Sequence, residues 1–88
     1  MYPYMVFADG TEVNHSQLID KDGKQTVIVH FERPTEKGFN TARCELPEYR
    51  WIKKEGYTAE EIANFETFLQ HNAHLLFKYA ASGGIHFA

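Results

Sequence analysis

The amphipathic stretch over residues 58–81 constrains the fold more than any other part of the chain. Thr58 and Glu61 have the spacing of a capping box, in which the two side chains satisfy free amides at the start of a helix. Gly83 and Gly84 follow, and glycine favours the left-handed conformation that ends many helices. The pattern predicts one long helix that ends just before this glycine pair.

The apolar side of this predicted helix is unusually wide. At about 100° per residue, its apolar residues span an arc of roughly 200°, about twice that of an ordinary surface helix. A single sheet face would leave part of this arc exposed, so we predict a homodimer, the commonest symmetric assembly. The alternative is that residues 85–88 fold back over the patch. The predicted interface consists of Phe68, Leu75, Phe77 and Tyr79.

The rest of the chain has the pattern of strands and turns. Residues 4–7, 12–20, 25–33 and 41–46 have strand character, and Asp-Gly pairs at positions 9–10 and 22–23 are typical of hairpin turns. Residues 35–39 are expected to form a longer loop, and Pro47 can open a short helix over residues 48–55. The predicted fold is a single α+β domain over residues 1–88. In it, an antiparallel meander of three to four strands is followed by a short helix and the long helix packed on the sheet.

Side-chain alternation assigns the two faces of this sheet, because successive residues of a strand point to opposite sides. The face toward the long helix should carry Val27, Val29, Phe31, Ala42, Cys44 and Leu46. The opposite face should carry Thr26, Ile28, His30, Glu32, Thr41, Arg43 and Glu45.

Composition narrows the class of protein. A net charge of −3 argues against nucleic-acid binding by the whole surface. No apolar run is long enough to span a bilayer, and the start of the chain lacks the pattern of a secretory signal. A single cysteine fits a reducing cytoplasm. We therefore expect a cytoplasmic protein without a membrane segment.

Metal binding is the first chemistry to consider. His71 and His74 are three residues apart on the predicted helix, but zinc needs three or four ligands. His15, His30 and His86 are the remote candidates, and none has a second ligand at a suitable spacing. We predict no metal and no cofactor.

Two residues of the predicted core could belong to a pocket instead. Asn72 lies within the apolar arc, where an amide either ties down a strand or lines a pocket or subunit interface. Cys44 and His30 point to opposite faces, so Cys44 is predicted to be a buried structural thiol. A small hydrolase or ligand-binding protein centred on Asn72 and Cys44 is one hypothesis.

Basic residues define a candidate RNA surface. Arg50, Lys53 and Lys54 occur beside Tyr49 and Trp51, and basic residues among aromatic ones can hold single-stranded RNA. The alternative is the solvent-exposed side of an ordinary short helix. His30 and Arg43 are further candidates for an RNA-cleaving site.

Several scattered positions form a recognisable pattern: Val29-His30-Phe31, the run from Ala42 to Leu46, and Asn72 in the helix. Over roughly residues 30–80, this pattern resembles a family of small uncharacterised bacterial proteins encoded in toxin–antitoxin-like gene pairs. The resemblance implies a bacterial cytoplasmic protein with a partner. Our preferred hypothesis is a non-enzymatic protein-interaction module that acts through the long helix. The alternative is an RNA-binding or RNA-cleaving component of such a pair.

Overall fold

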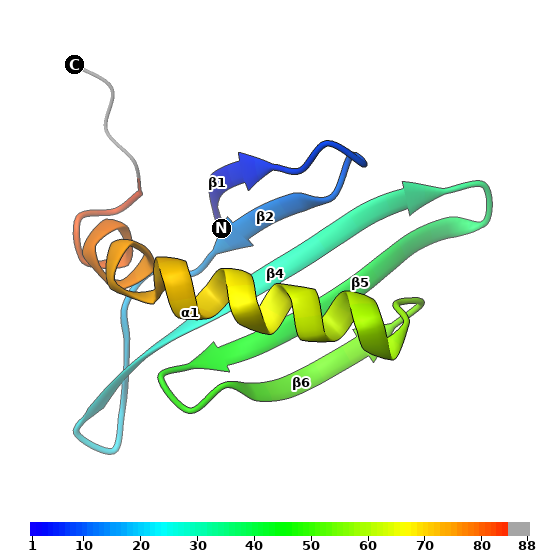
Figure 1. Cartoon of the computed structure of the whole chain (residues 1–88). Helices are drawn as coiled ribbons and strands as arrows, with labels where there is room; N and C mark the ends of the chain where they lie inside the picture. Colours follow the sequence, from blue (N-terminus) through cyan, green and yellow to red (C-terminus); the bar gives the residue numbers. More distant parts are fainter. Residues whose placement is uncertain (85–88) are drawn as a thin grey trace.

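The computed structural model describes residues 1–84 and shows an antiparallel sheet of six strands with one helix lying across one face (Figure 1). The strand order is β1-β2-β4-β5-β6, and β3 pairs with the beginning of β4. The fold-back of residues 85–88, considered as the alternative to a dimer, and His86 lie outside the described residues. The elements are β1 (Tyr2–Val6), β2 (Glu12–His15), β3 (Ile19–Lys21), β4 (Lys24–Thr35), β5 (Gly38–Leu46), β6 (Arg50–Glu55) and α1 (Ala59–Ala81).

The long helix and both of its end signals are confirmed. Thr58 Oγ1 accepts from the amide of Glu61 at 3.1 Å, and the Glu61 carboxylate accepts from the amide of Thr58 at 3.0 Å. Gly83 and Gly84 have φ values of 79° and 105°, which a residue with a Cβ adopts only under strain. The sequence therefore sets both ends of α1 locally.

The hairpin of β4 and β5 forms the centre of the sheet. The two strands pair from Val27 with Leu46 to Thr35 with Gly38, so Pro34 lies within the ladder instead of ending the strand. The loop predicted over residues 35–39 is wrong, because only residues 36 and 37 separate the strands. The predicted helix-facing side is confirmed, and all six of its side chains are fully buried: Val27, Val29, Phe31, Ala42, Cys44 and Leu46.

The short helix predicted over residues 48–55 is wrong, because this segment contains strand β6. Glutamate, arginine and lysine favour helices locally, but a strand here pairs the main chain of β5 that would otherwise form an open edge. Trp51 lies opposite Cys44, and its ring centroid is 6.0 Å from that of Phe31. With β1, β3 and β6 all present, the prediction of three to four strands is too low.

Aromatic rings join the helix to the sheet. Phe31 on β4 stacks on Phe65 of α1, with ring centroids 4.2 Å apart and planes 5° from parallel. Phe7, before β2, contacts both rings, and Tyr57 packs edge-on to Phe65 at 4.9 Å. The core is therefore centred where α1 crosses β4.

Replacing Phe31 with alanine should lower the free energy of unfolding by about 3–5 kcal/mol, because it removes a fully buried ring. Phe39→Ala is the matched control, since Phe39 is 62% exposed at the end of the same hairpin. The control should change stability by less than about 0.5 kcal/mol. Urea denaturation measures both, and equal losses would contradict a core centred on Phe31.

Candidate functional site

The face of the sheet turned away from α1 is covered by no other element of residues 1–84 (Figure 1). Four polar residues lie side by side on this open face: Asn14 opposite His30, His30 opposite Arg43, and Arg43 opposite Lys53. We call these four residues the basic row. Neighbouring strands are about 4.8 Å apart, so the row extends about 14 Å across β2, β4, β5 and β6.

Carboxylates flank the basic row on both sides. A second row, which contains Glu12, Glu32 and Glu55, lies two positions along the strands from the basic row, at a distance of about 7 Å. On the other side lies Glu45, between Ile28 and Arg50. The open face therefore alternates in charge along the strand direction.

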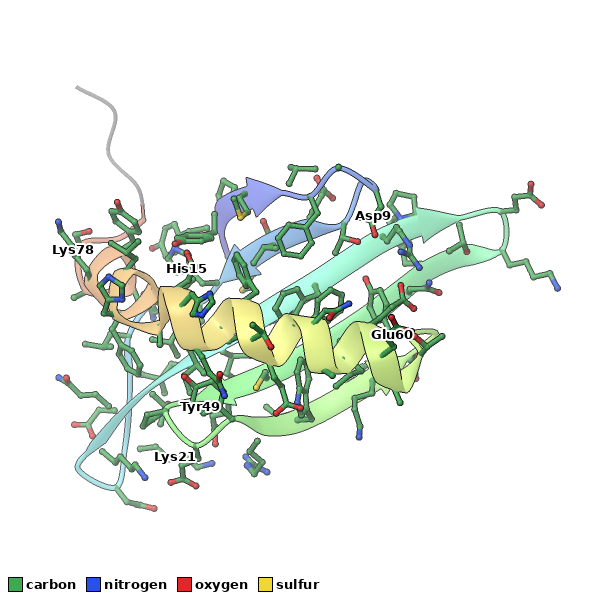
Figure 2. All side chains as sticks on the ribbon, in the orientation of Figure 1. Asp9, His15, Lys21, Tyr49, Glu60 and Lys78 are labelled. Atoms are coloured by element: carbon green, nitrogen blue, oxygen red, sulfur yellow. The ribbon has the colours of Figure 1, made fainter. Side chains whose placement is uncertain are left out.

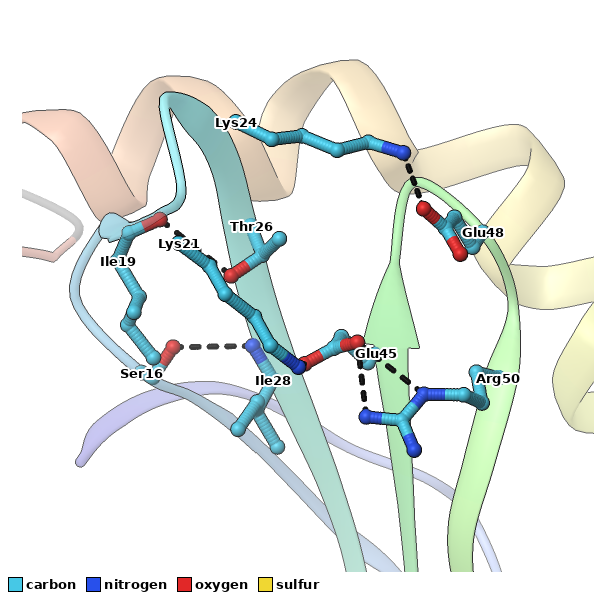
Figure 3. A network of polar contacts seen from close by, with 9 residues as sticks. All are labelled: Ser16, Ile19, Lys21, Lys24, Thr26, Ile28, Glu45, Glu48 and Arg50. Atoms are coloured by element: carbon cyan, nitrogen blue, oxygen red, sulfur yellow. Dashed lines mark hydrogen bonds and ion pairs between the residues drawn. The ribbon is translucent and has the colours of Figure 1, made fainter.

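Glu45 belongs to a network of charges that satisfy one another (Figure 3). Its carboxylate accepts from Arg50 Nη2 at 3.0 Å and from Lys21 Nζ at 3.5 Å. These bonds, with Arg50 the main contributor, lower the pKa of Glu45. Lys24 pairs with Glu48, and together with Asp22 these residues line a hollow of about 310 Å³. The hollow is lined by as many acidic as basic residues, which leaves little net charge to attract an ion.

Arg43 differs from the other two arginines of the chain. Arg33 pairs with Asp9 at 2.9 Å and Glu61 at 3.1 Å, and Arg50 pairs with Glu45. Within residues 1–84, Arg43 makes no ion pair, and its buried Nε has no hydrogen-bond partner. An unpaired donor of a buried charged group is costly, so Arg43 is the least satisfied side chain of the open face.

His30, the neighbour of Arg43, is half-buried and electrically neutral at pH 7. Burial is the largest cause that lowers its pKa to about 4, and the positive charges of Arg43 and of the amino terminus lower it further. A neutral imidazole can donate one hydrogen bond and accept another. His30 therefore adds hydrogen-bonding capacity beside Arg43 without adding charge.

The three candidate RNA residues do not form one cluster. Because β6 is a strand, Arg50 and Lys53 point to the open face, whereas Lys54 lies opposite Ala42 on the side of α1. Arg50 is paired with Glu45, and Lys53 lies 3.5 Å from Glu55. Of these three residues, only Lys53 joins the basic row, where it lies beside the further candidates His30 and Arg43.

Strand β1 covers much of the helix surface that we predicted to be an interface. The ring of Phe68 lies 6.1 Å from that of Tyr4 and 5.0 Å from that of Phe7. Tyr79 lies 6.1 Å from Tyr4. The sequence analysis missed this role of β1, although aromatic residues at positions 2, 4 and 7 were its signal. Leu75 is half-buried on this flank, and Phe77 packs against the core from the opposite flank.

Asn72 ties β1 to the helix. Its Oδ1 accepts from the hydroxyl of Tyr4 at 2.7 Å, and its Nδ2 donates to the carbonyl of Phe68 at 2.8 Å. Asn72 thus has the first of the two roles considered for it, which is to hold a strand.

Cys44 and the histidines have separate environments. Burial is the main cause that raises the pKa of Cys44 to about 12, followed by Glu66 and Glu45, and its side chain points away from His30. His15, which is labelled in Figure 2, is fully buried, and its ring lies 5.6 Å from that of Tyr2 and 6.3 Å from that of Tyr4. The sequence analysis did not predict this burial. Within the described part of the chain, no three His, Cys, Asp or Glu side chains gather as a metal site. His71 and His74 are exposed on α1.

No helix among residues 1–84 is long and apolar enough to cross a membrane. No family model, curated protein or solved structure matches this chain. The resemblance to the family of toxin–antitoxin-like gene pairs therefore stays a prediction.

The low pKa of His30 predicts a loss of stability in acid. The folded value of about 4 lies below the ordinary value of 6.5, so the unfolded chain binds the proton more readily between these values. Stability should fall as the pH drops through this window, by about 1–2 kcal/mol after allowance for solvent screening of a half-buried group. Urea denaturation at pH 7 and pH 4.5 should show a smaller loss for His30→Gln than for the parent. Equal losses would contradict the assignment.

Proposed function

We propose that this chain is a non-enzymatic protein-interaction module that forms a homodimer at the margin between β1 and α1. The observation that carries the proposal is a difference between the two edges of the sheet. In β6, four of six residues are charged, whereas β1, Tyr-Pro-Tyr-Met-Val, has none. Charged side chains deter edge-to-edge association, so β6 is protected in a way that β1 is not.

The helix flank beside β1 extends this apolar edge. Tyr4 contacts Phe68, Asn72 and Tyr79, and Leu75 shares their flank by its spacing along α1. On a helical wheel Leu75 lies beyond Phe68, farther from the core. Met5 on β1 is 44% exposed. We call Met5, Phe68, Leu75 and Tyr79 the β1 margin.

A second copy related by a two-fold axis is the occupant that fits the β1 margin. Pro3 lacks an amide donor, and the pairing of β1 is irregular between Pro3 and Met5. Both features shorten the main-chain edge that a neighbour can pair with, so side chains of the margin would supply most of the contact. A closed pair, and not an extending sheet, is the expected product.

The proposal also covers the cellular location and the origin of the protein. A single, fully buried cysteine with a raised pKa supports a structural thiol in a reducing cytoplasm. A bacterial origin and a partner from a toxin–antitoxin-like pair rest on the family resemblance alone.

Sedimentation at tens of micromolar tests the dimer. A monomer has a mass of 10.2 kDa, and we expect the parent protein to sediment at about twice that mass. The double variant Met5→Lys, Leu75→Lys should be a folded monomer, because it places charges at the centre of the margin. Ile52→Lys is the matched control, since Ile52 is 46% exposed on β6, and it should stay dimeric. A parent protein at the mass of one chain would refute the proposal.

RNA binding is the second candidate, and the shared face of His30, Arg43 and Lys53 is the observation that favours it. This function predicts that binding of single-stranded RNA weakens steeply with salt and is lost in Arg43→Ala. Filter binding at two salt concentrations measures both effects. Binding that is insensitive to salt and to this substitution would argue against the open face as an RNA site.

A further inference from the structure

The main chain of Arg43 is held in a fixed place. Arg43 belongs to β5, which is paired on both sides, with β4 through His30 and with β6 through Lys53. Its side chain is half-buried, and its Nε is shielded from water without a partner. Strand β5 therefore presents, at a fixed position of the sheet, a guanidinium whose hydrogen-bonding capacity is not met within residues 1–84.

We propose that the open sheet face binds an extended segment of a partner protein that carries one isolated acidic residue, with the carboxylate of that residue paired to Arg43. A guanidinium presents parallel N–H donors that match the two oxygens of a carboxylate. Arg33 and Arg50 already have this kind of partner within residues 1–84, and Arg43 has none there. Binding would pair the outer N–H donors of the guanidinium, which have no hydrogen-bond partner within residues 1–84.

The neighbours of Arg43 are suited to such a ligand. The neutral imidazole of His30 and the amide of Asn14 extend the row on one side and can hydrogen-bond to the main chain of the segment. Lys53 lies on the other side, where Glu55 already offsets its charge. The positive charge of the row is therefore concentrated at Arg43, which favours one carboxylate over a series of anions.

The flanking carboxylates decide between a protein partner and RNA. Glu12, Glu32 and Glu55 on one side and Glu45 on the other lie about 7 Å along the strands from the basic row. A nucleic-acid backbone that crossed the row would bring successive phosphates against these groups. An extended peptide with a single acidic residue avoids this repulsion, and basic residues two positions away would complement the glutamates. The recognised segment is thus an isolated acidic residue between basic ones.

Side-chain NMR of the full chain tests this inference, with the peptide Lys-Thr-Glu-Thr-Lys, blocked at both ends, as the probe. The Nε–H resonance of Arg43 should shift saturably with the peptide, while that of the paired Arg50 should not. The counterpart with glutamine in place of glutamate should bind about tenfold more weakly, which is the expected loss of one charge-assisted pair.

Two variants and one competing anion complete the experiment. Arg43→Lys keeps the positive charge but loses the parallel N–H donors of the guanidinium, so it should also weaken binding about tenfold. Arg50→Lys is the control and should bind like the parent. No saturable shift of Arg43, or equal binding of the glutamate and glutamine peptides, would overturn the proposal. So would tighter binding of inorganic phosphate or of oligouridine than of the peptide, because either result would assign the face to phosphoryl groups.

Discussion

The stack of Phe31 on Phe65 is the interaction on which the rest of the structure depends. It joins the longest strand to the only helix among residues 1–84, with ring planes 5° from parallel. Because Phe31 points to α1, the alternation of a strand directs His30 and Glu32 to the other face. Pairing with β5 then brings Arg43 beside His30. The polar arrangement of the open face thus follows from the position of one aromatic ring in the core.

The two surfaces that we propose for binding have different chemistry and lie on different parts of the fold. The β1 margin is apolar and lies where the sheet edge meets the helix. The basic row is polar and lies on the face that the helix leaves uncovered (Figure 1). Association of two copies at the margin would therefore leave Arg43 accessible on each copy. In this arrangement, the β1 margin would form the dimer and the basic row would bind the partner protein.

Local signals in the sequence were sufficient for the helix and for the two faces of the central hairpin. Thr58, Glu61 and the glycine pair act within a few residues, and apolar and polar residues alternate in β4 from Val29 to Glu32. Strand β6 could not be predicted in this way, because its conformation depends on pairing with β5 and not on its own propensity. The same holds for the basic row. His30, Arg43 and Lys53 become neighbours only through the registers of two strand pairs, and the second contains an irregularity beside Arg43.

The hydrogen bond from Tyr4 to Asn72 links residues 68 positions apart, and this has a consequence for synthesis of the protein on the ribosome. A chain emerges from its amino terminus, so the aromatic residues of β1 appear before the strands and the helix that follow them in the sequence. Their partners on α1, Phe68, Asn72 and Tyr79, are made only after all six strands. Strand β1 is therefore made before the other five strands, but its contacts with α1 form only after the helix has emerged. Until then, Pro3 and the irregular pairing of β1 make this strand a poor template for strand pairing with neighbouring nascent chains.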